Sequence, residues 1–238
     1  MNKPVILVTG SSRGIGAATV KLLRERGAKV LCHASKQYDE HTIAADLAEP
    51  IGPQVLWEEA LERGGGRIDA LVNNAGVYEA NPITSSDIDW LDRWEDTLRI
   101  NLTASAQLSR FAVKRWLEQN QPGRLVHMAS RAGHRGDSPE HWHYAASKGG
   151  MLAMHMSIAR AYALNGILSF AIAPGFTDTA MAEDYLATRG GPGLIADIPL
   201  GRVAAPEEIA AAAVFCALDA PASMTGAVLD ANGASYVR

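Results

Sequence analysis

Tyr144 and Lys148 form a pair whose chemical types and spacing could support proton transfer. They lie four residues apart in a stretch whose apolar residues keep a helical period as far as Asn165. Positions i and i+4 share one face of a helix, about 6 Å apart along its axis. The pKa of a phenol is about 10, and a neighbouring cation lowers it toward neutral. The spacing therefore predicts a general acid/base, although the same spacing also occurs on ordinary helix surfaces.

The composition is typical of a globular chain with a large core. The 238 residues are 47% hydrophobic and 20% charged, with a formal net charge of −4. This charge balance gives no electrostatic reason to expect nucleic acid or an anionic membrane as a partner. No apolar run reaches the ~18 residues of a membrane span, and no signal-peptide pattern is found. Cys32 and Cys216 lack metal-ligand spacing, so we expect reduced core thiols, no metal site and a cytoplasmic location.

A glycine-rich turn near the start of the chain indicates a phosphate-binding site. The apolar run 4–9 predicts a buried strand, and Gly10, Gly14 and Gly16 follow it at the start of a helical pattern. Backbone N–H groups converge at such a turn, and glycines let the backbone approach a pyrophosphate closely. The spacing G-x-x-x-G-x-G differs from G-x-G-x-x-G, and an ordinary strand-to-helix turn is the alternative.

The end of the next strand, 29–34, bears on which dinucleotide would bind. A ribose 2′-hydroxyl calls for Asp or Glu about 20 residues beyond the glycines. The chain has Ser35 and Lys36 there, and Arg13 lies in the glycine turn itself. These cations suit a 2′-phosphate, so we expect NADP(H) rather than NAD(H). Asp39 could still reach the ribose, so NAD(H) stays open.

The remaining pattern alternates strands with helices. Further strands are predicted at 42–47, 68–72, 123–130, 167–173 and 226–231. Helices are predicted at 50–66, at 87–119 as a short helix followed by a longer one, at 144–165 and at 206–218. The stretch 131–143 is expected to be a loop, the crossover after residue 34 to be abbreviated, and 176–199 to form a substrate lid.

This order predicts an α/β fold, a doubly wound parallel sheet of seven strands with helices on both faces, in one domain spanning 1–238. Ligands of such sheets bind beyond the carboxyl ends of the strands. Polar or glycine-containing segments follow four strands there: the glycine turn, Asn73-Asn74, Ser130 and Pro174-Gly175. We therefore expect one site at this edge.

As an ordered set, these segments resemble the short-chain dehydrogenase/reductase family, with its Rossmann-type fold, over the whole chain. Asn101, Ser130, Tyr144 and Lys148 fall in the order of the family's catalytic tetrad. The cofactor contacts implied by the resemblance and the sequence are Gly10, Ser12, Arg13, Gly14, Ile15, Gly16, Ser35, Lys36, Asp46, Leu47, Asn74, Ala75, Gly76, Tyr144, Lys148, Pro174, Gly175, Thr177 and Thr179. The tail from Leu200 to Gly233 is most similar to the β-ketoacyl-acyl-carrier-protein reductase branch.

The resemblance implies a role for each member of the tetrad. Tyr144 would donate a proton to a carbonyl oxygen while NADPH delivers hydride to the carbon, and Lys148 would lower the phenol's pKa and bind the nicotinamide ribose. Ser130 would hydrogen-bond the substrate oxygen, where negative charge develops. Asn101 would hold a water that relays protons toward Lys148. Replacing Tyr144 by Phe is expected to remove carbonyl reduction.

The substrate stays open at this point. The family's ketone reductases act on acyl thioesters, sugars, steroids and small cyclic ketones, and commonly assemble as homotetramers. The interval between Ser130 and Tyr144 is one residue longer than usual, which alters the loop beside the substrate. An acyl-carrier-protein partner would need basic residues near the mouth, for which Arg131, Arg135 and Arg189 are candidates. The alternatives are an NAD-dependent sugar-alcohol or dihydrodiol dehydrogenase and a non-catalytic NADP-binding sensor module.

Overall fold

A parallel sheet of seven strands forms the centre of the molecule, as predicted. The structure is a computed structural model, and it describes residues 3–37, 39–179 and 191–238. The order of the strands is β3-β2-β1-β4-β5-β6-β7, and every neighbouring pair is parallel. The strands are β1 Val5–Val8, β2 Lys29–Ala34, β3 Thr42–Ala44, β4 Ala70–Asn73, β5 Gly123–Met128, β6 Ile167–Pro174 and β7 Val228–Ala231.

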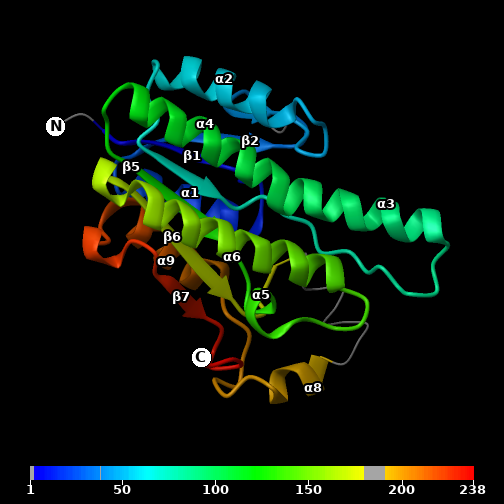
Figure 1. Ribbon diagram of the computed structural model, residues 1–238. Coiled ribbons are helices and arrows are strands. Elements are labelled where there is room, and N and C mark those ends of the chain that lie inside the picture. Colours follow the sequence, from blue (N-terminus) through cyan, green and yellow to red (C-terminus); the bar gives the residue numbers. More distant parts are fainter. Residues whose placement is uncertain (1–2, 38, 180–190) are drawn as a thin grey trace.

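Helices cover both faces of this sheet (Figure 1). On one face lie α1 (Gly14–Glu25) and α9 (Pro206–Leu218), and on the other lie α2 (Gly52–Gly64), α4 (Ala104–Glu118) and α6 (Trp142–Tyr162). Two large apolar clusters result, because strand residues alternate between the faces. Ile6 and Val8 pack with α1 and α9, whereas Val5 and Leu7 pack toward α2 and α4.

The strands were recognisable as continuous apolar runs because both of their faces are covered. All eight residues of β6 are buried, for example. The crossover between β2 and β3 is abbreviated as predicted, since residues 35–37 and 39–41 form no helix. Among the helices that the structure describes, none is both long enough and apolar enough to cross a membrane.

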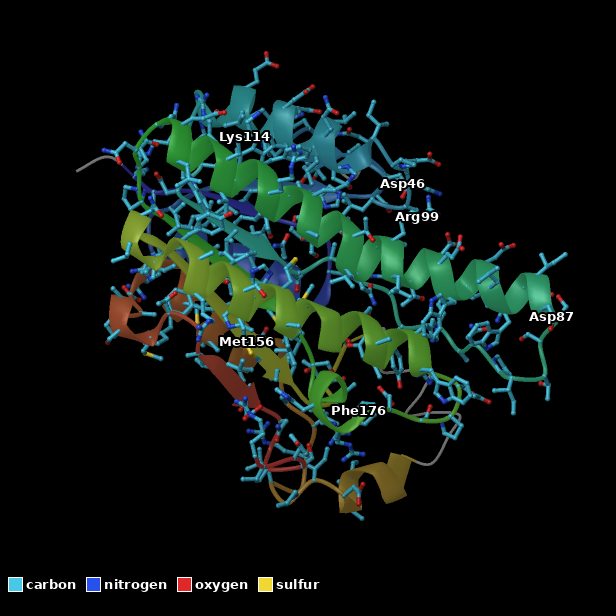
Figure 2. The ribbon with its side chains drawn as sticks, in the orientation of Figure 1. Asp46, Asp87, Arg99, Lys114, Met156 and Phe176 are labelled. Carbon is cyan, nitrogen blue, oxygen red and sulfur yellow. The ribbon has the colours of Figure 1, made fainter. Side chains whose placement is uncertain are left out.

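The helical region 87–119 differs from the prediction only at the junction of its two helices. Helix α3 (Asp87–Leu98) is followed by the longer α4, as predicted, but the two are joined by a π-helical turn at Arg99–Thr103 that the sequence pattern did not indicate. Ser86 caps α3 through a hydrogen bond from the Asp89 N–H to its Oγ. Figure 2 labels Asp87 at the start of α3 and Arg99 at this turn. Single π turns occur mainly at functional sites, and this one contains Asn101.

The loop predicted at 131–143 is wrong in part, because it contains the short helix α5 (Ala132–Arg135). Gly133 lets α5 lie directly against α6: a Cβ at this position would meet the carbonyl carbon of Lys148 at 2.8 Å. The two glycines of this segment therefore reflect close packing as well as chain reversal, which the sequence pattern does not distinguish. Helix α6 itself begins at Trp142, two positions before the predicted start at 144, and the last residues predicted for it, Ala163–Asn165, are 3-10.

The predicted lid at 176–199 falls partly outside the described residues, which stop at Thr179 and resume at Gly191. On its near side, a bridge pairs Thr177 with Ala204. On its far side, α8 spans Gly191–Ala196.

Candidate active site

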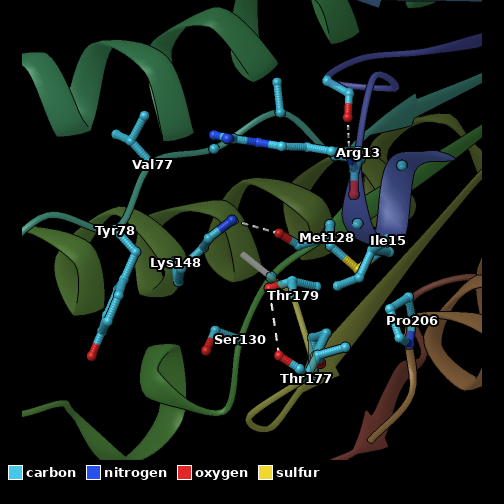
Figure 3. Close-up of a pocket in the computed structure, with 18 of the residues that line it drawn as sticks. Arg13, Ile15, Val77, Tyr78, Met128, Ser130, Lys148, Thr177, Thr179 and Pro206 are labelled. Carbon is cyan, nitrogen blue, oxygen red and sulfur yellow. Dashed lines mark hydrogen bonds between the residues drawn. The ribbon is translucent and has the colours of Figure 1, made fainter. Parts of the chain in front are cut away.

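A pocket of ≈ 1030 Å³ opens at the carboxyl ends of the strands, where the parallel topology predicts a ligand site. It is lined by the turn between β1 and α1, the ends of β2, β4, β5 and β6, and the start of α6. Figure 3 shows residues from these separate segments facing one another, with Arg13 at one end and Tyr78 at the other. The volume lies at the upper end of the range for small-molecule sites, about 300–1,000 Å³.

The pocket brings together most of the residues predicted for the site. Those that line it are Gly10, Ser12, Arg13, Gly14, Ile15, Gly16, Ser35, Asp46, Leu47, Asn74, Ala75, Gly76, Ser130, Tyr144, Lys148, Pro174, Gly175, Thr177 and Thr179. Lys36 and Asn101 are not among the lining residues. Lys36, the lysine predicted for a 2′-phosphate, is exposed to solvent in this structure.

The glycines of the first turn are required by close packing of backbone against backbone. A Cβ at Gly16 would lie 2.1 Å from the Gly10 carbonyl oxygen and 2.6 Å from Nδ2 of Asn74. Asn74 Nδ2 donates to the carbonyls of Thr9 and Gly10, both at 2.9 Å, and so ties the turn to the end of β4. The turn is therefore held in one conformation.

His33 is a residue of this pocket that the sequence reasoning missed. The Gly10 N–H donates to its Nδ1 at 3.0 Å, and its Nε2 donates to the Ala45 carbonyl at 2.9 Å. Burial lowers the pKa of His33, which keeps the ring neutral and able to accept at Nδ1. A polar side chain within the apolar strand 29–34 was the available signal.

The lining residues fit a nicotinamide dinucleotide. No acidic residue occupies the first turn of α1, and Arg13 at its N-cap makes no capping bond, so the helix N-terminus can accept a phosphate. The glycine turn leaves the space that side chains would fill. Arg13 lines this end of the pocket, as does Lys21 of α1, which the sequence reasoning did not single out. Arg13 is thus found at the pocket as predicted, and Lys21 rather than Lys36 is the lysine near this turn that lines it.

The same pocket is also lined, away from the glycine turn, by Ser130, Tyr144 and Lys148. The Lys148 ammonium is 5.6 Å from the centre of the Tyr144 ring and donates to the Met128 carbonyl at 2.7 Å (Figure 3 shows this hydrogen bond). The Ser130 hydroxyl oxygen accepts the Ala132 N–H at 3.1 Å, which leaves its own proton available for another acceptor. Helix α6 therefore holds Tyr144 and Lys148 on one face, beside the end of β5.

The prediction that Lys148 lowers the pKa of Tyr144 toward neutral is wrong for this structure. Burial is the largest influence on the phenol and raises the pKa of Tyr144 to about 12, and a hydrogen bond with Ser130 opposes this increase. Burial also lowers the pKa of Lys148 to about 8. Desolvation disfavours the charged form of each group. The phenol is thus held protonated at neutral pH.

Asn101 lies buried beside the pocket and contacts two of the segments that form it. It is fully buried, its Oδ1 accepts the Val77 N–H at 2.8 Å, and its Nδ2 donates to the Val77 carbonyl and to Ser147 Oγ. Both amide hydrogens are used by protein groups, so the side-chain amide has no N–H left for the predicted water. Asn101 thus ties the segment after Gly76 to α6, near Lys148, and its role in holding a water stays a prediction.

An aromatic wall that the sequence reasoning missed borders Tyr144. The Tyr78 ring lies edge-on to Tyr144 at 4.7 Å and stacks on His141 at 4.0 Å. Its hydroxyl donates to Asp137 Oδ1 at 3.3 Å. These residues come from the segment after β4 and from 131–143, and sequence spacing gives no signal for their contact. Across the described ranges, no three His, Cys, Asp or Glu side chains are grouped to hold a metal ion.

Comparisons with known proteins agree with this geometry. A family model described as enoyl-(acyl carrier protein) reductase matches residues 10–233. The 3-oxoacyl-(acyl-carrier-protein) reductase of Vibrio cholerae is 34% identical over 244 residues, covering 98% of this chain and 97% of that protein. Nodulation protein G of a Rhizobium strain is 32% identical over 238 residues, covering 95% and 94%. A crystal structure of a putative NAD(P)-dependent gluconate 5-dehydrogenase from Beutenbergia cavernae, with NADP bound at low occupancy, superposes with a TM-score of 0.86. The two chains are 31% identical, over 97% of this chain and 95% of that one.

Proposed function

Because this chain belongs to the short-chain dehydrogenase/reductase family, whose members oxidise CH–OH groups with NAD(P), we propose that it interconverts a ketone and a secondary alcohol with NADP(H). The observation that carries the proposal is that Ser130, Tyr144 and Lys148 share one pocket with the glycine turn. A non-catalytic sensor would not need this acid/base group next to its nucleotide site. The presence of the Ser130, Tyr144 and Lys148 group beside the glycine turn therefore favours an enzyme over a sensor.

NADP(H) is the cofactor that fits the turn. When bound, it supplies or accepts the hydride. Arg13 and Lys21 would hold its phosphates together with the N-terminus of α1. His33 would keep the Gly10 N–H in place through their hydrogen bond. NADP bound in the related Beutenbergia structure supports this assignment.

The proton chemistry follows from the state of Tyr144. A phenol whose pKa is raised to about 12 carries its proton at neutral pH and is ready to donate it to a carbonyl oxygen, as ketone reduction requires. Ser130 Oγ–H donates to the same oxygen, where negative charge develops. Lys148 replaces the proton that Tyr144 has given, and Asn101 keeps α6 and the segment after β4 in register around it.

The substrate is a ketone of one of two classes. The curated relatives favour a 3-oxoacyl thioester, since the Vibrio cholerae protein is named for that activity. The Beutenbergia neighbour, named as a putative gluconate 5-dehydrogenase, favours an oxo or hydroxy acid. The basic patch considered for a carrier protein is not supported at Arg131, which is buried. Arg189 lies outside the described residues.

The test uses Tyr144→Phe and a panel of ketones. Wild-type protein is expected to consume NADPH with at least one of a 3-oxoacyl thioester, an oxo acid or a cyclic diketone, and to prefer NADPH to NADH. Tyr144→Phe should lose this turnover by at least about 100-fold, the usual contribution of a general acid, while binding NADPH with unchanged affinity. Retained turnover in the variant would falsify the role of Tyr144.

We also propose that the chain works as a homotetramer in the cytoplasm. The outer face of α6 exposes small residues and Met156, which is 42% exposed and labelled in Figure 2. Such a face allows close approach of a second helix. Cys32 and Cys216 are buried free thiols, as suits a reducing compartment. Light scattering coupled to size exclusion measures the number of subunits, and a monomer would contradict the proposed homotetramer.

A further inference from the structure

The proposed ketone reduction assigns no role to Arg131, a charged side chain in the pocket. Arg131 directly follows Ser130, lines the pocket, and is only 8% exposed. Its guanidinium stacks on the ring of Phe176 at 4.8 Å, and Phe176 is labelled in Figure 2 just beyond the end of β6. The group is therefore held against an aromatic face, away from bulk water.

The charge of Arg131 is not neutralised by a contact within the described residues. Its Nη1 is buried without a hydrogen-bond partner, and the side chain forms no ion pair in that part of the chain. A buried guanidinium normally has carboxylate or carbonyl partners, because an unpaired buried charge costs several kcal/mol. An orphaned N–H on a side chain that lines a ligand pocket is consistent with a missing partner that belongs to a ligand.

The charges around Arg131 are of both signs. Burial lowers the pKa of Arg131, and Arg135, which also lines the pocket, lowers this pKa further, whereas Asp137 and Asp197 raise it. Asp137 Oδ1 already accepts from the Tyr78 hydroxyl and from the Ser138 N–H. No ion pair joins either carboxylate to Arg131 in the part of the chain that the structure describes, so the guanidinium can still take a carboxylate partner from a ligand.

The position of Arg131 is rigid relative to the reacting atoms. Its backbone N–H donates to the Pro174 carbonyl at 3.0 Å, and its α5 neighbours pack against α6 through Gly133. Ser130 is the adjacent residue, so the guanidinium and the hydroxyl that faces the substrate oxygen are supported by the same turn. A group bound by Arg131 therefore lies within the reach of a small substrate.

We propose that Arg131 binds a carboxylate of the substrate, and that the enzyme consequently acts on oxo acids and the corresponding hydroxy acids. This inference rests on the proposed function and narrows its substrate class. A guanidinium presents two parallel N–H groups that match the two oxygens of a carboxylate, and a water-poor site strengthens the pair. The same burial separates Arg131 from any carrier-protein surface.

The experiment compares oxo acids with their methyl esters, which differ mainly in charge. 4-Oxopentanoate, 5-oxohexanoate and 6-oxoheptanoate, each with its ester, are assayed with NADPH for the wild type, Arg131→Met and Arg131→Lys. Arg131→Met should lower kcat/KM for the preferred acid on the order of 10- to 100-fold, the loss expected for a charge-assisted hydrogen bond. The ester should change by less than about 3-fold, since it makes no such bond. Arg131→Lys should recover part of the acid activity.

A binding measurement keeps the outcome independent of turnover. With NADPH present, hexanoate should raise the melting temperature of the wild type, and hexanamide should not, whereas Arg131→Met should lose the response to hexanoate. NADPH affinity and circular dichroism confirm that the variant is folded. Equal responses of wild type and Arg131→Met to hexanoate, or an acid-to-ester ratio unchanged by the substitution, would overturn the inference. Reduction of esters alone by both proteins would do the same while leaving the proposed ketone reduction intact. Failure to reduce any ketone would instead count against the proposed function, and the hexanoate response would still decide the role of Arg131.

Discussion

Replacing Lys148 by Met should remove activity and at the same time stabilise the fold. Lys148 is 4% exposed, and burial lowers its pKa from 10.5 to about 8. At about 1.4 kcal/mol for each tenfold change in the proton equilibrium, this burial costs about 3 kcal/mol when the group is charged. Losing the hydrogen bond to the Met128 carbonyl offsets about 1 kcal/mol. The expected net gain at pH 7 is about 2 kcal/mol, or ~4–8 °C in Tm for a domain of this size.

The pH dependence of this gain identifies its cause. The folded pKa lies below the unfolded value, so the unfolded chain binds more protons between about pH 8 and 10.5. The destabilisation is fully present below the folded pKa and disappears as the pH rises through the unfolded one. Urea unfolding of wild type and Lys148→Met at pH 7 and pH 9.5 measures this, and the gain at pH 9.5 should be smaller by about 2 kcal/mol. The exposed Lys114, paired with Glu118 at 3.7 Å, gives a control in Lys114→Met, expected within about 0.5 kcal/mol of wild type. A Lys148→Met protein that is less stable at pH 7, or whose gain does not change with pH, would refute the reasoning.

Two further substitutions test the turn and the interior. Gly16→Ala places a methyl group 2.1 Å from the Gly10 carbonyl oxygen, so it should lower the free energy of unfolding by about 1–3 kcal/mol and remove most of the NADPH affinity. Urea unfolding and fluorescence titration measure these two quantities. The control Gly64→Ala meets only ordinary contacts from 3.5 Å and should leave stability and NADPH affinity unchanged. His127 is fully buried with its pKa lowered to about 3, so its contribution to stability, present above its unfolded pKa near about 6.5, is lost as the pH falls toward 3. His127→Leu should therefore lose less stability than the wild type between pH 6.5 and 4, and parallel pH profiles of the urea midpoint would contradict this.

The directions of the pKa changes at Tyr144 and Lys148 show how the fold trades stability for chemistry. Burial keeps Tyr144 protonated and makes the Lys148 ammonium a readier proton donor. The Lys148 ammonium is charged at neutral pH, so its burial destabilises the folded protein and the rest of the core must compensate, whereas the neutral Tyr144 carries no such cost. An active site that is destabilised for its function is a common compromise.

Local sequence patterns determined the parts of this protein that depend on nearest neighbours along the chain. Continuous apolar runs indicated the buried strands, because a sheet covered on both faces requires apolar residues at every position. The i to i+4 spacing placed Tyr144 and Lys148 on one helix face, and the glycines placed a phosphate-binding turn after β1. Alternation of strands and helices then predicted a parallel sheet and the edge at which these segments meet.

Only the tertiary structure decided the features that depend on neighbours distant in the chain. The contact of His33 with Gly10, the hydrogen bonds of Asn101 to Val77 and Ser147, and the stacking of Arg131 on Phe176 each join segments that sequence spacing cannot pair. The ionisation of Tyr144 was predicted in the wrong direction for the same reason. Spacing specifies which charge lies nearby, whereas a pKa also depends on how much water the surrounding chain removes, and that quantity exists only once the chain has folded.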